Sequence, residues 1–171
     1  MHWSAKLADS PAVIQTAMGN TETALQEAYE GLRLANQLCF PLYACAKEII
    51  RQYRARLEPL GLTYTQYLTM LALWEFGSMT EGELGRKLLL DSGTLAPLLK
   101  RLQRQGYIDR IRPKENERKL YISLTAQGEQ LKQEAIHIPD AMRECLPLSE
   151  EEQNQLGNLL KKAMLGMEFA K

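Results

Sequence analysis

The chain lacks a long uninterrupted run of apolar residues, and no stretch approaches the ~18 residues needed to span a membrane. Its first residues also lack the basic start and apolar stretch typical of a secretory signal. It has only 3 cysteines and 2 histidines, and their spacing is not typical of a metal site. We therefore expect a cytoplasmic protein with free thiols, no membrane span, no metal and no other cofactor.

The chain also lacks an excess of charge of one sign, because 21 basic side chains balance 21 acidic ones among its 171 residues. The balance is uneven along the sequence. Residues 97–119 have eight Lys or Arg against three Asp or Glu, a net +5, so the remaining residues sum to −5. This pattern excludes a protein that is cationic all over, and it indicates one basic face suited to binding DNA.

Hydrophobic spacing predicts a mostly helical chain. Pro41 fits the first turn of a long helix over residues 40–57, where its missing N–H costs nothing. Asp91 or Ser92 would cap a helix that runs to about Gln105. The other helices are predicted over residues 21–34, 63–77, 80–89, 125–138 and 150–169, with capping boxes at Thr63, Thr80 and Ser149 and a break at Pro139.

Two short strands are predicted between these helices, at residues 107–112 and 120–124, joined by a polar turn. The order of elements predicts a mainly α (α+β) fold, a winged helix–turn–helix core with a two-stranded wing. N- and C-terminal dimerisation helices would flank this core. We expect an obligate homodimer, because two copies can bury apolar arms that one chain leaves open, and its symmetry suits a palindromic operator.

The predicted domain boundaries follow from this order. Residues 1–35 are expected to be an N-terminal extension, partly disordered or a short helix. The predicted domain covers residues 36–171, with dimerisation helices at 36–60 and 139–171 and the winged helix–turn–helix core with its connecting helix at 61–138.

The helix that begins near Ser92 has the features of a DNA recognition helix. Its first turn offers the hydroxyls of Ser92 and Thr94, together with free backbone N–H groups that favour a phosphate. An ordinary capped surface helix is the alternative interpretation, which the compact basic hairpin after it disfavours. The further candidate DNA contacts on this helix and hairpin are Pro97, Lys100, Arg101, Arg110 and Arg118.

Cys39 stands at the start of the first long helix, where a helix N-terminus favours the reactive thiolate. Tyr43 and Tyr53 follow on roughly the same face, and their hydroxyls could stabilise a thiolate. Since 14 residues span about 21 Å of helix, Tyr53 can reach only the Cys39 of a partner subunit. The alternative is that Cys39 is a small buried apolar residue. Cys45 lies on a different face of the helix, and we expect it to serve packing.

Four segments resemble the MarR family of dimeric winged-helix repressors, and most closely its OhrR-type branch, which senses organic hydroperoxides. They are LCFPLY at 38–43, LGLTYTQYLTMLALWE at 60–75, LDSGTLAPLLKRL at 90–102 and ERKLYISLTAQG at 117–128. The resemblance implies a repressor that leaves its operator when Cys39 is oxidised by an organic hydroperoxide. It also implies that Arg118 is the wing arginine that enters the minor groove, although Asn116 replaces the aspartate that usually accompanies this arginine.

The resemblance further suggests a role for Cys145. Some OhrR-like proteins use a second cysteine in this region, from the other subunit, as the resolving thiol, and otherwise a small-molecule thiol would cap Cys39. Two other functions remain open. One is a MarR-like regulator released by a phenolic or lipophilic ligand, with Cys39 incidental. The other is a small thiol peroxidase, which the lack of an acid–base pair near Cys39 in the sequence disfavours, so we expect no enzyme.

Overall fold

A computed structural model describes residues 24–26, 28–114 and 119–167 of the chain. Contacts within the chain divide it into two units, Met1–Glu48 and Ile49–Lys171, and each is described by itself. The boundary near residue 36 that the sequence suggests stays a prediction. Among the described residues, no helix combines the length and the apolar character needed to cross a bilayer.

The first unit is a run of short helical segments that leads into a long helix. Residues 24–26 and 28–31 are helical, as predicted, and η1 (Leu34–Asn36) follows. Asn36 donates a 2.7 Å hydrogen bond to the Glu30 carbonyl, which holds the turn between them. Helix α2 (Cys39–Leu57) then begins and continues into the second unit. None of the described residues up to Glu48 is buried, so the described part of this unit has no core of its own.

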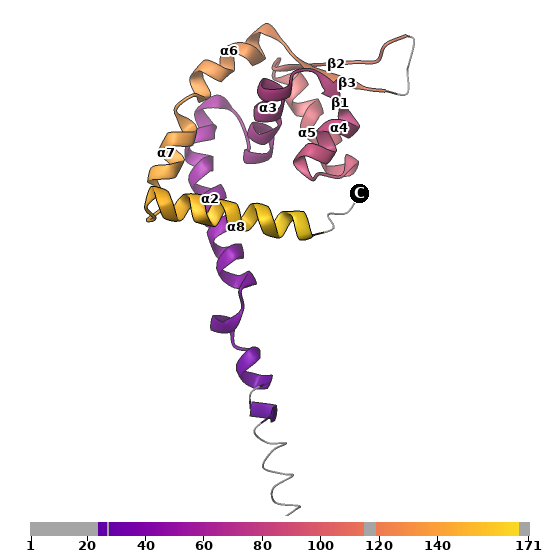
Figure 1. Cartoon of the computed structure of the whole chain (residues 1–171). Helices are drawn as coiled ribbons and strands as arrows, with labels where there is room; N and C mark the ends of the chain where they lie inside the picture. Colours follow the sequence, from indigo (N-terminus) through magenta and orange to yellow (C-terminus); the bar gives the residue numbers. More distant parts are fainter. Residues whose placement is uncertain (1–23, 27, 115–118, 168–171) are drawn as a thin grey trace, which may run out of the picture. The chain divides into compact units, whose positions relative to one another are not determined.

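The second unit has the core. Helices α3 (Tyr64–Phe76), α4 (Glu81–Leu88) and α5 (Ser92–Arg104) pack against one another and against a small sheet (Figure 1). Each contributes apolar side chains that are shielded from water, such as Leu73, Leu84 and Leu99. The short helix η2 (Glu58–Leu60) connects α2 to α3. This trihelical arrangement is the predicted helix–turn–helix core.

The sheet has three antiparallel strands, β1 (Met79–Thr80), β2 (Ile108–Ile111) and β3 (Tyr121–Leu124), in the order β1-β3-β2. The predicted hairpin of β2 and β3 is confirmed, with Ile108 opposite Leu124 and Ile111 opposite Tyr121. Strand β1 was not predicted. It is two residues long and pairs Met79 with Ile122, which is too short for an alternating pattern to reveal.

The predicted helix starts are confirmed at all three capping boxes, Thr63, Thr80 and Ser149. The helix over residues 125–138 was predicted as one piece with Pro139 as its end, which is wrong in one respect. Helix α6 (Ala126–Ala135) ends earlier, and α7 (Ile138–Glu144) begins with Pro139 in its first turn, where a proline needs no N–H partner.

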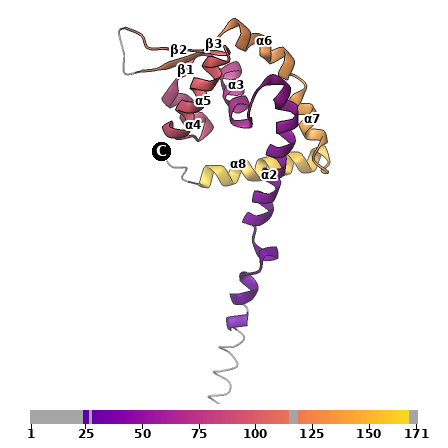
Figure 2. The same cartoon turned by 180° about the vertical axis from the view of Figure 1, so that it is seen from behind.

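Helix α8 (Glu150–Gly166) completes the described chain, and the predicted end at residue 169 lies outside the described residues. Figure 2 shows α6, α7 and α8 following one another along the chain, with a sharp turn between α7 and α8. Helix α8 has no buried residue. Its large apolar side chains are therefore open to water in a single chain.

Candidate DNA-reading surface and redox cysteines

Helix α5 begins with a tightly held cap. Asp91 is the N-cap: its carboxylate accepts a 2.9 Å hydrogen bond from the Thr94 N–H and a 2.8 Å hydrogen bond from the Thr94 hydroxyl. Both hydrogen bonds lower the pKa of Asp91, and the bond from the Thr94 side chain has the larger effect. The Thr94 hydroxyl, expected to be available to DNA, is thus already donating within the protein.

The outer face of α5 is polar and exposed. Leu95, Leu99 and Leu102 point into the core and anchor the helix. Pro97 stands in the second turn and cannot donate to the carbonyl of Gly93, a loss that water can compensate because Gly93 is exposed. All five candidate contacts on this helix are exposed: Ser92, Thr94, Pro97, Lys100 and Arg101.

The basic residues of the wing are not equally accessible. Arg110 lies on β2 opposite Ile122 and is half-buried, and its Nε atom is buried without a hydrogen-bond partner among the described residues. Arg112 and Lys119, at the base of the wing, line a hollow of about 870 Å³ together with Arg86 and the first residues of α5. Arg118 lies outside the described residues.

Three cysteines are free and exposed: Cys39, Cys45 and Cys145. Cys39 is the first residue of α2, as predicted, and in a single chain it is not the buried apolar residue of the alternative interpretation. Cys45, which we expect to serve packing, is exposed in a single chain, and no described residue up to Glu48 is buried. Tyr43 is also exposed, with Lys47 Nζ 6.0 Å from the centroid of its ring.

Tyr53 belongs to an aromatic cluster that the sequence did not predict as a unit. Its ring centroid lies 4.7 Å from that of Tyr64 and 5.8 Å from that of Tyr67, which in turn contacts Trp74 edge-on at 6.4 Å. Burial raises the pKa of Tyr53 and Tyr64, and it raises the pKa of Tyr67 to about 12. The three phenols therefore stay protonated at neutral pH and can act as hydrogen-bond donors.

Cys145 follows the end of α7 and meets the end of α2. Arg56 Nη2 lies 3.1 Å from Cys145 Sγ and 3.4 Å from the Ala141 carbonyl oxygen. The Cys145 thiol itself donates to the same carbonyl at 3.2 Å. No sequence pattern pointed to Arg56, because 89 residues separate it from Cys145.

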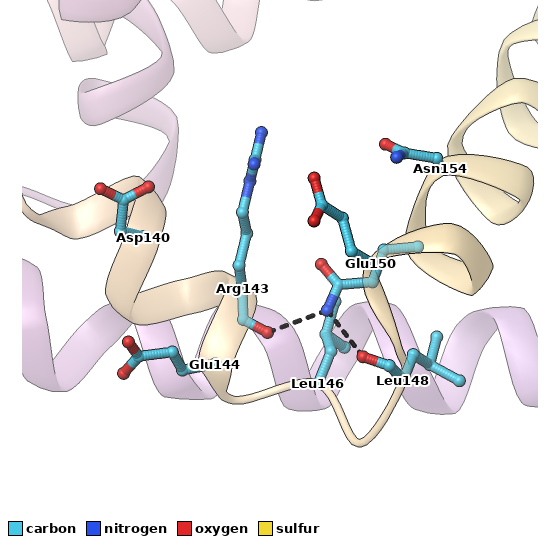
Figure 3. Close-up of a pocket in the computed structure, with 8 residues that line it drawn as sticks. Asp140, Arg143, Glu144, Leu146, Leu148, Glu150 and Asn154 are labelled. Carbon is cyan, nitrogen blue, oxygen red and sulfur yellow. Dashed lines mark hydrogen bonds between the residues drawn. The ribbon is translucent and has the colours of Figure 1, made fainter.

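Beside Cys145, the corner between α7 and α8 holds an open hollow of about 670 Å³. Figure 3 shows Arg143 extending into it from α7, with the carboxylates of Asp140, Glu144 and Glu150 around it. Gln153 closes the corner by donating to the carbonyls of Arg143 and Leu148. Within the part of the chain that the structure describes, no group of three or more His, Cys, Asp or Glu side chains could hold a metal ion.

A helix–turn–helix with an exposed second helix, followed by an antiparallel wing with a basic base, defines a winged-helix DNA-binding protein. The family model of the transcriptional regulators SarA/Rot matches residues 51–135. The organic hydroperoxide resistance transcriptional regulator of Bacillus subtilis (strain 168) is 43% identical over 136 residues, which cover 80% of this chain and 92% of that protein.

Two structures of AbfR, a Staphylococcus epidermidis protein, are also similar. Reduced AbfR bound to DNA has a TM-score of 0.70 and 36% identity, covering 80% of this chain and 94% of that one. Disulfide-formed AbfR has a TM-score of 0.58 and 38% identity, with coverage of 82% and 94%. The chain belongs to the MarR family of winged-helix transcriptional regulators, in the branch of the organic hydroperoxide regulators.

Proposed function

We propose that this protein is a homodimeric, DNA-binding transcriptional repressor that senses organic hydroperoxides through Cys39 and then releases a palindromic operator. The observation that carries the proposal is the exposed Cys39 thiol at the first residue of a long helix, in a chain whose other unit presents a DNA-reading helix. Such a repressor acts at the chromosome, which for a bacterial regulator places it in the cytoplasm.

On the DNA side, α5 enters the major groove. Ser92 and Thr94 face bases or phosphates at its start, and Lys100 and Arg101 reach the phosphate backbone further along. Thr94 must exchange its bond to Asp91, or share it, to contact a base. Pro97 adds an apolar contact surface to the same face. The wing contributes Arg110 and Arg118, of which Arg118 enters the minor groove.

The dimer follows from apolar surface that a single chain leaves open. In α8 the large apolar side chains are at least 40% exposed, and Leu165 is 91% exposed. The first unit likewise leaves Leu38, Phe40 and Leu42 exposed around Cys39. A second copy that covers both stretches would remove this surface from water and pair two recognition helices for a two-fold operator.

The sensing step is the reduction of the peroxide by Cys39. The thiolate attacks the peroxide oxygen, the O–O bond breaks, and the alkoxide leaves and takes a proton to become an alcohol. Cys39 is thereby oxidised to a sulfenic acid. Tyr53 of the partner, with Tyr64 packed on its ring, and Tyr43 of the same helix would donate hydrogen bonds to the thiolate before it reacts.

Cys145 of the other subunit resolves the sulfenic acid. Its sulfur attacks the Cys39 sulfur, the S–O bond breaks, and the oxygen leaves as water, so a disulfide joins the two subunits. Each site consumes one peroxide and then needs reduction, which is the behaviour of a switch rather than of an enzyme. A small-molecule thiol would take the place of Cys145 if the two cysteines do not meet.

A gel-shift titration against the promoter DNA beside its own gene tests the proposal. The reduced protein is expected to bind, treatment with cumene hydroperoxide to abolish binding, and dithiothreitol to restore it. The Cys39→Ser variant should stay bound in peroxide, while the matched Cys45→Ser variant should behave as the unmodified protein does. Peroxide-driven release of the Cys39→Ser variant would refute the proposal.

The same titration distinguishes the other two functions. Release by a phenolic or lipophilic compound under reducing conditions would favour a ligand-controlled regulator in which Cys39 is incidental. Repeated turnover of cumene hydroperoxide with a thiol reductant, at many peroxides per subunit, would favour a thiol peroxidase.

A further inference from the structure

The contact between Arg56 and Cys145 joins the last turn of α2 to the end of α7. We propose that Arg56 is a positioning residue for the resolving step, which holds Cys145 Sγ and stabilises the negative charge this sulfur bears when it attacks oxidised Cys39. The inference rests on the proposed function, because it assigns Arg56 to the second step of that redox chemistry.

The geometry is that of a charged donor aimed at a sulfur. Arg56 Nη2 lies 3.1 Å from Cys145 Sγ, and the same nitrogen lies 3.4 Å from the Ala141 carbonyl oxygen. Arg56 Nη1 lies 3.4 Å from the Gln52 carbonyl oxygen one helical turn back, which fixes the other arm of the guanidinium. Arg56 is half-buried, whereas Cys145 is exposed, so its sulfur is accessible to an oxidised cysteine of another subunit.

The corner next to Cys145 in the chain offers one other cation. Asp140, Glu144 and Glu150 place three carboxylates at this corner, together with Arg143 (Figure 3). Arg143 is close in sequence, but Figure 3 shows its side chain extending between Asp140 and Glu150. The hydrogen bond to the sulfur comes from Arg56.

The chemistry of the step uses this bond directly. The nucleophile is the thiolate, so the Cys145 proton, which points to the Ala141 carbonyl, passes to solvent. The sulfur then forms the S–S bond as the S–O bond of the sulfenic acid breaks, and hydroxide leaves with a solvent proton as water. A guanidinium hydrogen bond strengthens when its acceptor becomes an anion, so Arg56 assists the attack.

The two steps are measured separately after mixing with cumene hydroperoxide. Dimedone labelling of Cys39 in the Cys145→Ser background reports the first step, and quenched alkylation with non-reducing gels reports the disulfide. Arg56→Gln should leave the first rate unchanged and slow the second about tenfold, the order expected for one charge-assisted hydrogen bond. Arg56→Lys should recover most of the rate, and Arg54→Gln, an exposed arginine of the same helix, should change neither step.

A second assay depends on no peroxide chemistry. With Cys39 and Cys45 both changed to Ser, Cys145 is the single thiol, and its exchange with the neutral probe 2,2′-dithiodipyridine should also be about tenfold slower in Arg56→Gln. Should that variant not fold, the folded Cys145-only protein is expected to react faster than the same protein in urea.

These measurements tell two failures apart. No dimedone label on Cys39 would overturn the proposed function, and with it the role of Arg56 in resolution. A normal Cys39 label with equal disulfide and probe rates in Arg56→Gln, or a folded Cys145 no faster than the unfolded one, would overturn the inference alone. An equal slowing of both steps would mean that Arg56 is merely structural.

Discussion

Replacing Gly128 with alanine tests how the wing is joined to the connecting helix. Gly128 is the third residue of α6, and its N–H donates to the capping hydroxyl of Thr125 at 3.0 Å. A Cβ added there would lie 2.1 Å from the Tyr107 carbonyl oxygen, at least 1.3 Å short of the 3.4 Å at which ordinary contact begins. Because a backbone atom is in the way, no side-chain rotation relieves the clash, and α6 must move off the start of β2.

The magnitude follows from the contacts this movement disturbs. Overpacking against a backbone costs about 3 kcal/mol at the upper end of its range. The 2.9 Å hydrogen bond from Trp74 Nε1 to the Gly128 carbonyl would stretch, which costs about 1 kcal/mol more. Alanine returns about 1 kcal/mol through its higher helix propensity. The net loss is about 3 kcal/mol, or roughly 6–12 °C in Tm for a chain of this size.

Urea unfolding followed by circular dichroism at one fixed protein concentration measures this loss. The matched control is Gly82→Ala in α4, an exposed glycine where the added Cβ would meet only the flexible Arg86 guanidinium at 3.8 Å. That control should be as stable as the unmodified protein or slightly more stable. A Gly128→Ala protein no less stable than the control would refute the reasoning, since the clash would then be relieved without disturbing the cap.

Three further predictions concern single residues and pH. Leu89 ends α4 with a φ of 55°, a left-handed conformation that costs a leucine about 1 kcal/mol, so Leu89→Asn should raise the urea midpoint, and a lower midpoint would contradict strain at this turn. The folded pKa of Tyr67 is raised to about 12, so the contribution of Tyr67 to stability should be full below pH 10 and be lost between pH 10 and 12. In alkaline urea titrations, Tyr67→Phe should reduce this loss of stability. The pKa of Asp91 is lowered, so its stabilisation is present above its ordinary value of 3.8 and is lost as the pH falls below it; Asp91→Asn should weaken this acid dependence, and an unchanged acid limb would contradict it.

Local signals predicted the helices well because the physics that starts and ends a helix lies within a few residues. Thr63, Thr80 and Ser149 each satisfy the N–H three residues on, and the structure begins a helix after each. The break near Pro139 was partly missed for the same reason. A proline is compatible with the first turn of a helix as well as with the position after its last residue. The second helix, α7, forms because Ile138 and Met142 pack into the core.

Contacts between distant elements could not be predicted in the same way. Tyr53 and Tyr64 stand on successive helices, and their ring contact depends on the angle at which η2 turns the chain. The contact between Arg56 and Cys145 depends on the position at which α7 ends, and the hydrophobic periodicity of the sequence does not predict that position. The sequence therefore indicated the cysteines and tyrosines that we propose for redox chemistry, but not the side chains that contact them.

The uneven burial of the chain bears on how its stability must be measured. The described core lies wholly within the second unit, from Leu57 to Met142, while α8 and the described residues up to Glu48 have no buried side chain in a single chain. Exposed apolar surface of this kind marks an interaction site, so we expect folding of these helices and association of two copies to be one process. The Tm of the unmodified protein should then rise with protein concentration. In α8 variants such as Leu160→Glu, the Tm should no longer depend on protein concentration. A concentration-independent Tm for the unmodified protein would mean that the helices fold without a second copy.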